Sequence, residues 1–502
     1  MVHNSKLPII ITPIFVILLP IFLLFEKNPG EIWVEDFLLL SVFLTALVLS
    51  VTLVFFVVRK SLLIAALATG IVFSPLLILC ESDAYAYNLG IWLLASLLAM
   101  TFLFAPIPNT YLKKAQEFVL FSCSVFIGFL TISICKSKLH ITQAKKRVKE
   151  NLESELSSLI NHNPIKNHCE SDIYCIILDE FISPNTFSNY YKYDNKDFFS
   201  FLNKVGFQLV KHSYSNYAWT IPSISSLVSL QYHKNWVAKK EFPQIAQALI
   251  EYNLIGKLLK QEGYKIYSIP SIYWLGNTTK GIWKDFLLRT KSYGLIMSVL
   301  RSTPFAPKAR GYQCIQHRHH IFKQLKEIRR IIENKEKKFV FVHLLCPHRP
   351  IVFDKTGNKL CKDAIFLSEK DSKHLYYLDQ AYFLSKEIEK IIEKILCFSK
   401  KPPLILLLSD HGKFPIGVSG KGKITLPLNE LSWRFSNLIA LRLPDPAPTI
   451  PDVFTLTNAF RIILKHYFGY NLELLEDVCY TNFLDFNEKC LTSNLIDFQN
   501  IE

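Results

Sequence analysis

Two adjacent carboxylates end an apolar run, Ile173-Tyr-Cys-Ile-Ile-Leu-Asp-Glu180. The run is rich in β-forming residues and predicts a buried strand. A buried carboxylate without a partner is costly, so Asp179 and Glu180 must face a compensating charge. An ion pair at the end of the strand is the simple explanation, and a bound metal ion is the alternative.

A second stretch that could do chemistry is Asn216-Tyr-Ala-Trp-Thr-Ile-Pro-Ser-Ile224. Thr220 precedes Pro222 and several serines, a pattern typical of a helix start. A hydroxyl at a helix N-terminus lies among free N–H groups and the positive end of the helix dipole, which suits a phosphate-like anion. The simpler interpretation is that Thr220 is a plain N-cap.

Histidines mark the ends of two further apolar runs. In Phe339-Val-Phe-Val-His-Leu-Leu-Cys-Pro-His-Arg-Pro350, we expect His343 to lie in the strand with a structural role. His348 stands in the proline-bracketed loop beyond it and is the better candidate for a ligand or proton donor. The other run, Leu404–Ser409, leads into Asp410 and His411, and the glycine that follows lets the backbone turn sharply.

Strand-like runs alternate with helical stretches from residue 170 onward, which predicts an α/β domain with a mostly parallel sheet. The predicted strands are 173–178, 339–345 and 404–408, and the predicted helices are 321–337 and 376–396. Such sheets bind ligands where their strands end. Carboxylates, a hydroxyl and an imidazole gathered there suit a divalent metal, which would turn the Thr220 hydroxyl into a nucleophile.

Before this domain, the first quarter of the chain holds five long uncharged apolar runs. Each has roughly the 17–25 residues that cross a bilayer, so we expect an integral membrane protein with five transmembrane helices. A cleaved signal peptide would explain the first run alone. The runs are Leu7–Phe25, Phe37–Val58, Ser61–Cys80, Leu89–Pro106 and Phe118–Cys135.

Loop charges predict the orientation of these spans. Arg59-Lys60 and Lys113-Lys114 lie in the second and fourth short loops, whereas the first and third loops are acidic. The positive-inside rule therefore predicts a cytoplasmic N-terminus and an extracytoplasmic C-terminal domain. The expected boundaries are a membrane domain over 1–138, a juxtamembrane linker over 139–169 and a catalytic domain over 170–502.

The part of the chain beyond residue 138 carries nearly all of the net charge of +15. A basic domain at a membrane surface favours anionic headgroups, and its external placement argues against nucleic acid as the partner. The dense cluster His317-Arg-His-His320 precedes a predicted helix, and we expect it to form a solvated or lipid-facing patch. Local disulfide candidates are Cys169–Cys175 and Cys479–Cys490.

The order Asp-Glu, Thr, Pro-His-x-Pro, Ser-Asp-His-Gly resembles the sulfatase-like branch of the alkaline phosphatase superfamily. It is most similar to membrane-anchored members such as phosphoethanolamine transferases and lipoteichoic acid synthases, which have about five spans before an external catalytic domain. The resemblance covers most of 170–480 and implies an alkaline-phosphatase-like α/β fold. It also implies a bacterial inner membrane location with a periplasmic catalytic domain.

Carried onto this chain, the resemblance assigns Thr220 as nucleophile and metal ligand and His348 as the substrate-side histidine. It makes Asp179, Glu180, Asp410 and His411 the other ligands of a zinc, manganese or magnesium ion. Two departures stand out. The string from Thr220 to Ile224 lacks both the residue that becomes formylglycine and the arginine of true sulfatases, which disfavours classical sulfate-ester hydrolysis. The further histidine that zinc-dependent phosphoethanolamine transferases carry shortly after Asp-His-Gly is also absent.

The sequence thus predicts a metal-dependent transferase that moves a phospho-headgroup from a membrane phospholipid to an envelope lipid or glycan through a threonine-linked intermediate. One alternative is a phospho- or sulfo-ester hydrolase of the same fold, with water as the acceptor. Another is an inactive scaffold for envelope assembly, which the intact nucleophile and ligand set argue against.

Overall fold

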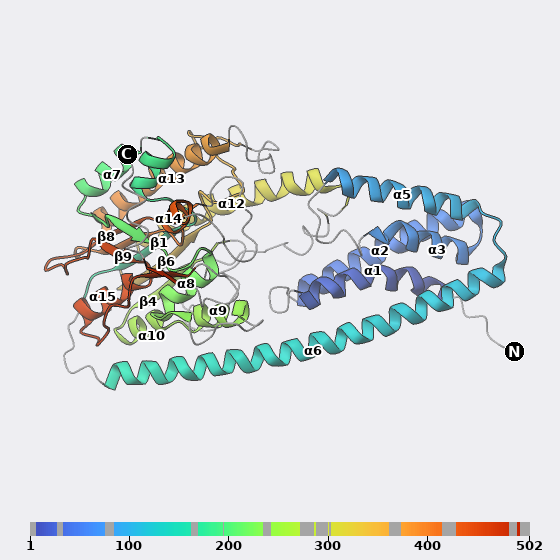
Figure 1. Ribbon diagram of the computed structural model, residues 1–502, viewed down its shortest axis with the longest axis horizontal. Helices are drawn as coiled ribbons and strands as arrows, with labels where there is room; N and C mark the ends of the chain where they lie inside the picture. Colours follow the sequence, from blue (N-terminus) through green and yellow to red (C-terminus); the bar gives the residue numbers. More distant parts are fainter. Residues whose placement is uncertain are drawn as a thin grey trace. The chain divides into compact units, whose positions relative to one another are not determined.

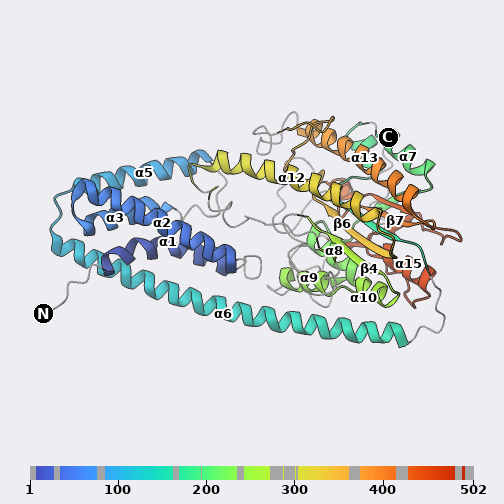
Figure 2. The same ribbon diagram turned by 180° about the vertical axis from the view of Figure 1, so that it is seen from behind.

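The computed structural model divides the chain into two compact units. One comprises residues 1–143 and 293–313, and the other comprises 144–292 and 314–502. Their elements are labelled in Figures 1 and 2. The structure describes residues 7–27, 34–75, 85–161, 169–193, 195–233, 242–271, 286–287, 300, 303–360, 373–413, 428–480 and 489–491.

The second unit is built on a seven-stranded sheet with the order β2-β8-β7-β1-β6-β4-β5. The strands from β7 to β5 are parallel neighbours, and β8 and β2 extend the sheet antiparallel at one edge. The predicted α/β domain is confirmed, and its sheet is mixed, with a parallel centre. The strands are β1 (Ile173–Leu178), β2 (Gln208–Leu209), β4 (Lys265–Ile269), β5 (Phe286–Leu287), β6 (Lys338–Leu344), β7 (Leu404–Leu408) and β8 (Ile439–Arg442).

The central strand β1 is apolar throughout because both of its faces are covered. All six of its side chains are buried, and they alternate between two hydrophobic cores. Tyr174 and Leu178 belong to one core, and Ile173 and Ile177 belong to the other. A parallel sheet buried on both faces needs this continuous apolar pattern rather than an alternating one.

Helices form the outer layers on each side of the sheet. α7, α12 and α13 contribute to the first core, and α8, α10 and α15 contribute to the second. Burying one leucine or isoleucine in such a core stabilises the fold by about 1.5–3 kcal/mol. These helices are α7 (Lys196–Lys204), α8 (Thr220–Ser229), α10 (Leu254–Gln261), α12 (Ala306–Ile332), α13 (Lys373–Phe398) and α15 (Asn458–Phe468).

Smaller elements complete this unit. β3 pairs with β9 in parallel, and β10 pairs with β11 antiparallel. They are β3 (His212–Tyr214), β9 (Val453–Thr455), β10 (Val478–Tyr480), β11 (Lys489–Leu491), α9 (Phe242–Glu251), α14 (Leu428–Phe435) and the π-helix Thr186–Tyr190.

The N-terminal part of the chain is helical. Two of its helices contain segments long and apolar enough to cross a membrane, Leu40–Arg59 and Asn109–Ile160, and three others hold shorter apolar stretches. The prediction of five spans therefore stays a prediction. The helices are α1 (Leu7–Lys27), α2 (Val34–Arg59), α3 (Leu62–Phe73), α5 (Tyr85–Phe104) and α6 (Asn109–Asn161).

The stretch predicted as the start of a juxtamembrane linker is helical, because α6 continues without interruption to Asn161. In the second unit, Val148 of α6 packs with Leu249 of α9 in a small apolar cluster. The Lys145 Nζ lies 3.5 Å from the Glu251 Oε2 beside it. The end of α6 is thus an integrated part of the folded α/β unit.

The helix predicted at 321–337 begins earlier, at Ala306, and ends at Ile332. The cluster from His317 to His320 therefore lies inside α12, and both His317 and His320 are buried. Residues three apart share one helix face, and this face packs into the protein. The expectation of a solvated patch is wrong for these two histidines, whereas His319 is exposed.

Of the two predicted local disulfides, Cys169–Cys175 is not formed. Cys169 and Cys175 are buried free thiols, and the extended backbone of β1 places no turn between them to bring their sulfurs together. Cys479 lies opposite Cys490 in the β10–β11 pair, and the side chain of Cys490 lies outside the described residues, so this disulfide stays a prediction.

Candidate active site

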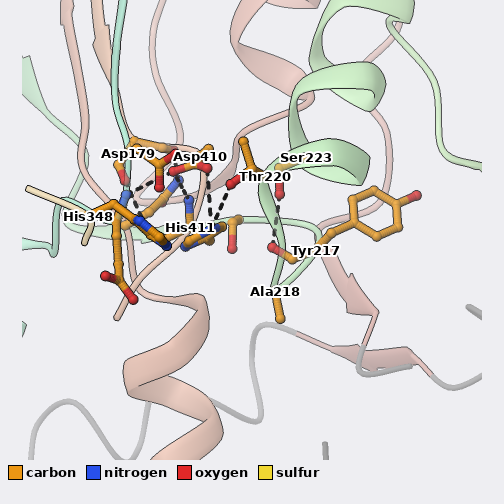
Figure 3. Close-up of polar contacts among 12 residues, drawn as sticks. Asp179, Tyr217, Ala218, Thr220, Ser223, His348, Asp410 and His411 are labelled. Carbon is orange, nitrogen blue, oxygen red and sulfur yellow. Dashed lines mark hydrogen bonds and ion pairs between the residues drawn. The ribbon is translucent and has the colours of Figure 1, made fainter. Parts of the chain in front are cut away.

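Three neighbouring parallel strands deliver the candidate residues to one edge of the sheet. β1 lies between β7 and β6, and each of these strands is followed by a loop that carries candidate residues. Asp179 follows β1, His348 lies in the loop after β6, and Asp410 follows β7. Because parallel strands all end at the same edge, residues far apart in the sequence meet there. Figure 3 shows these side chains close together.

Asp179, Asp410 and His411 form a group that could hold a metal ion. Each offers a ligand atom, and these atoms all lie within 4.8 Å of one another. The three side chains are buried. Both carboxylate oxygens of Asp179 and Oδ2 of Asp410 form no hydrogen bond with the described residues, although each Oδ2 faces an imidazole Nε2, of His343 at 3.2 Å and of His411 at 3.3 Å. Buried oxygens of this kind require compensation, and a divalent cation fits them.

Thr220 brings its hydroxyl to this group. It is the first residue of α8, and the N-cap residue is Trp219. The Thr220 Oγ1 lies 3.2 Å from Nε2 of His411, and the same Nε2 lies 3.3 Å from Oδ2 of Asp410. A hydroxyl, a carboxylate and an imidazole therefore converge on one point, beside the free N–H groups that begin a helix.

The ring of His411 is oriented by its own backbone. Its Nδ1 lies 2.9 Å from the Gly412 carbonyl oxygen, which would accept from Nδ1–H, and 3.0 Å from Nη1 of Arg434, which would donate to a bare Nδ1. In the tautomer with the proton on Nδ1, Nε2, which faces Asp410 and Thr220, can bind a metal, as is usual for metal-binding histidines. Burial and the Arg434 guanidinium lower the pKa of His411, which favours the neutral imidazole that a metal requires.

Glu180 adopts a left-handed backbone conformation, with φ of 64°. This turn lets its N–H donate to Oδ1 of Asp410 at 3.0 Å. Its carboxylate lies 3.7 Å from Lys413 Nζ and 3.6 Å from Arg434 Nη1. Burial opposes ionisation, but these cations and two nearby histidines lower the pKa of Glu180 to about 2.

His348 lies at the more open side of the group and is partly exposed. Its backbone N–H donates to the Asp179 carbonyl at 3.1 Å, and its ring Nδ1 lies 2.7 Å from the Arg349 carbonyl oxygen. Burial lowers the pKa of His348, but the carboxylates of Asp179 and Glu180 outweigh it and raise the pKa above its usual value. The site thus has a partly exposed imidazole beside Asp179.

The structure adds three residues that the sequence reasoning missed or set aside. Arg434 of α14 is a buried guanidinium that donates to the carbonyls of Ala218 and Gly412. Lys413 directly follows the Asp-His-Gly turn. His343 has its Nε2 3.2 Å from Oδ2 of Asp179. A sequence signal exists for Lys413, which adjoins the motif, but no local pattern distinguishes Arg434.

The fold and the site define a class of protein. It is an α/β enzyme in which a hydroxyl lies beside a group of residues that could bind a metal ion, Asp179, Asp410 and His411, here called the metal-type group. Within this class the chain belongs to the sulfatase family, because the family model described as Sulfatase matches residues 172–425, just over half of the chain. The predicted membership in the sulfatase-like branch of the alkaline phosphatase superfamily is confirmed. No curated protein matches the chain.

Several solved structures are similar at low sequence identity. The C-terminal periplasmic domain of EcEptC from Escherichia coli, in complex with zinc, is 13% identical, with a TM-score of 0.46, over 66% of this chain and 96% of that one. The corresponding domain of phosphoethanolamine transferase EptC from Campylobacter jejuni is 11% identical, with a TM-score of 0.37, over 60% and 90%. The putative sulfatase yidJ from Bacteroides fragilis is 12% identical, with a TM-score of 0.38, over 60% and 75%.

Proposed function

We propose that this enzyme transfers a phospho-headgroup from a membrane phospholipid to a hydroxyl on an envelope lipid or glycan. The observation that supports this most is the position of Thr220, whose Oγ1 lies 3.2 Å from His411 at the start of α8. A hydroxyl held beside a metal-type group is a suitable nucleophile for a phosphorus atom. The first N–H groups of α8 add positive potential for the phosphate oxygens.

Asp179, Asp410 and His411, with the Thr220 oxygen, are the proposed ligands of a zinc, manganese or magnesium ion, and the family resemblance adds Glu180 to this set. A divalent ion held there would supply Lewis-acid charge that favours ionisation of the hydroxyl and offsets the charge of the phosphate. The buried oxygens of Asp179 and Asp410 that form no hydrogen bond with the described residues are the feature of this chain that fits such an ion.

In the proposed first step, the Thr220 Oγ1 attacks the phosphorus of the donor headgroup and its proton is released to solvent. A bond forms between Oγ1 and phosphorus, and the bond from phosphorus to the lipid oxygen breaks. His348 would protonate that leaving oxygen, because its partly exposed imidazole lies in the loop beside Asp179 and an imidazole can carry a proton near neutral pH. In the second step a hydroxyl of the acceptor attacks the phosphorus and gives its proton to His348, the bond from phosphorus to Oγ1 breaks, and Oγ1 takes up a proton from solvent, which restores the free side chain.

Hydrolysis by the same site is the second candidate, with water in place of the acceptor hydroxyl. The match to the sulfatase family favours an ester-cleaving reaction of this general kind. Both candidates use the same nucleophile and the same metal-type group, and they differ only in what attacks the threonine-linked intermediate.

Substitution of Thr220 tests the proposal directly. Thr220→Ala should abolish turnover and leave the fold intact, and Thr220→Ser, which keeps the oxygen, should retain measurable activity. Intact-protein mass spectrometry after incubation with phosphatidylethanolamine and phosphatidylglycerol vesicles should find a headgroup-phosphate adduct on the Thr220 peptide. Full activity in Thr220→Ala would end the proposal, and turnover without any adduct would favour a hydrolase that uses water directly.

We also propose that residues 1–138 form a five-span membrane domain, 139–169 a juxtamembrane segment and 170–502 the catalytic domain, located in the periplasm of a bacterial cell. Apolar exposure supports the membrane assignment, since Phe118, Phe121 and Phe129 of α6 are each at least 70% exposed. Large apolar side chains exposed along one helix are typical of a surface that faces lipid. Mass spectrometry of envelope lipids and glycans with and without this gene would identify the donor and acceptor.

A further inference from the structure

The segment that leads to Thr220, residues 216–219, has all four of its carbonyl oxygens held by hydrogen bonds. In chain order, their donors are the Tyr480 N–H, the Ser223 hydroxyl, the Arg434 guanidinium and the Ser223 N–H. Ser223 lies in the first turn of α8, and Figure 3 shows its hydroxyl bound to the Tyr217 carbonyl. The main chain that carries the candidate nucleophile is therefore fixed from one end of this segment to the other.

Asn216 begins the segment, and its buried side chain has a complete set of hydrogen bonds. Its Oδ1 accepts from the Thr457 N–H at 2.9 Å and from the Thr457 hydroxyl at 2.7 Å. Its Nδ2 donates to the Val478 carbonyl at 2.9 Å and to the Tyr232 hydroxyl oxygen at 3.0 Å. An amide side chain offers two acceptor and two donor positions, so Asn216 uses its full capacity.

The partners of Asn216 call for a short amide side chain. The Thr457 N–H can only donate and the Val478 carbonyl can only accept, so the residue between them must present both an acceptor and a donor. An ionised aspartate has no donor for the carbonyl, and an alanine has neither group. A glutamine has both groups but is longer by one methylene, which has no space in a closely packed interior.

Thr457 connects the main chain on both sides of Thr220. It is the N-cap residue of α15 and is buried. Its Oγ1, which contacts Asn216, also lies 2.7 Å from the Ser226 Oγ of α8. Asn216 precedes Thr220 in the sequence and Ser226 follows it, so one buried hydroxyl holds the chain before and after the candidate nucleophile.

The placement of Thr220 depends on how its segment is held against the rest of the site. Its Oγ1 lies 3.2 Å from Nε2 of His411, which follows β7, whereas the bonds of Asn216 tie the segment to α15 and β10. A displacement of about 1 Å in a reacting group can cost on the order of 100-fold in rate, even when the substitution lies away from the reacting atoms. The Asn216 side chain therefore helps to set a distance on which the reaction depends.

We propose that Asn216, together with Thr457, is a positioning residue that holds the Thr220 hydroxyl at the metal-type group. This inference rests on the proposed function, because it requires Thr220 to be the nucleophile. Neither residue contacts the substrate in this scheme. Loss of the Asn216 side chain should therefore slow the attack of Thr220 and leave metal binding and substrate binding unchanged.

Cleavage of bis(p-nitrophenyl) phosphate by the full detergent-solubilised, zinc-loaded chain tests the proposal. Asn216→Ala should lower kcat by about 10–100-fold, the cost of a misplaced reacting group, with KM and zinc affinity close to those of the wild type. Thr457→Val should also lower kcat, and Thr457→Ser, which keeps the hydroxyl, should retain most of it. The rate of adduct formation at Thr220 on phosphatidylethanolamine and phosphatidylglycerol vesicles should fall in the same variants as kcat.

Asn253→Ala is the matched control. Asn253 is also buried, its Oδ1 accepts from the Gly256 N–H at 2.6 Å, and its Nδ2 donates to the Ile250 carbonyl at 3.1 Å. These bonds serve the start of α10, a helix that carries no candidate site residue. Asn253→Ala should lower the melting temperature as Asn216→Ala does, but its kcat should match the wild type.

Wild-type kcat in Asn216→Ala, or an equal loss of kcat in Asn253→Ala, would overturn the inference and leave the proposed function standing. If Asn216→Ala does not fold, the threonine variants decide, and equal kcat in Thr457→Val and Thr457→Ser would overturn it. Full activity in Thr220→Ala, or a wild-type chain that neither cleaves the ester nor forms the adduct, would end the proposed function and this inference together.

Discussion

The imidazole of His343 lies beside the Asp179 carboxylate and helps to orient it. Its Nε2 lies 3.2 Å from Oδ2 of Asp179, and its Nδ1 lies 3.0 Å from the Ser271 hydroxyl. The hydroxyl can donate to Nδ1, which leaves the ring proton on Nε2, facing the carboxylate. Partners of this kind orient metal-binding carboxylates. His343 is thus a positioning residue for Asp179 as well as a buried residue of β6.

We expect His343→Phe to lower zinc affinity by about 10–100-fold, because the ring volume stays but the nitrogen that faces Asp179 Oδ2 at 3.2 Å is lost. Zinc titration with a thermal melt of each variant measures this. His320→Phe is the matched control: His320 is equally buried, but its Nε2 lies 3.1 Å from the Pro270 carbonyl oxygen instead. Equal losses of zinc affinity in both variants would contradict the role given to His343.

The sequence predicted the residues that stand at element ends. Asp179 and Asp410 follow apolar runs, and Thr220 starts a helix. These local patterns, with the rule that ligands bind where parallel strands end, were enough to predict that the three residues lie together. Arg434 and His343 could not be found this way. One lies in a short amphipathic helix and the other inside a strand, and their roles arise from tertiary contacts over hundreds of residues.

At the scale of elements, the turn after β7 depends on a glycine for space. A Cβ at Gly412 would come within 2.8 Å or less of the carbonyl oxygens of Trp433, Arg434 and Ser436. Real side chains do not approach backbone oxygens so closely, so α14 and its connection to β8 would have to move. The Gly412 N–H also donates to the Arg434 carbonyl at 2.9 Å.

Gly412→Ala should therefore lower the free energy of unfolding by about 1–3 kcal/mol, the typical cost of an overpacked interior. It should also reduce activity, because the shifted turn would displace His411. Denaturant unfolding and turnover measure the two effects. Gly311→Ala is the control, since its added Cβ meets nothing within 4 Å in α12. This helix-interior change should be neutral or stabilising by up to about 1 kcal/mol. Similar behaviour of the two variants would contradict the steric argument.

Element boundaries were predictable where hydrophobic runs are continuous. β1 and β7 have the predicted ends, and β6 differs by one residue. α12 differs more, because its first turns contain the polar segment from Gln313 to His319, which gives no continuous apolar stripe. The antiparallel edge was not predicted at all, since β2 has two residues and β8 has four, too few for a periodic signal.

At the scale of the whole molecule, the predicted orientation can be tested with reporter fusions. Alkaline phosphatase fused after Glu502 should be active, and the same reporter fused after Lys60 should be inactive, because basic loops are retained in the cytoplasm. A green fluorescent protein fused at the same two points should give the opposite pattern. Reversed results would place the catalytic domain in the cytoplasm and remove the argument for an envelope substrate.

The order in which the ribosome makes the strands determines when the site can form. β1 has β6 and β7 as its neighbours, and Glu180 lies 230 residues from Asp410. A ribosome adds about 5–20 residues per second, so on the order of ten to fifty seconds pass between the two acids. During that time the edge of β1 that will receive β7 lies unpaired, and Asp179 lacks both other members of its group. A nascent chain therefore cannot assemble the group of Asp179, Asp410 and His411 until its last central strand has been made.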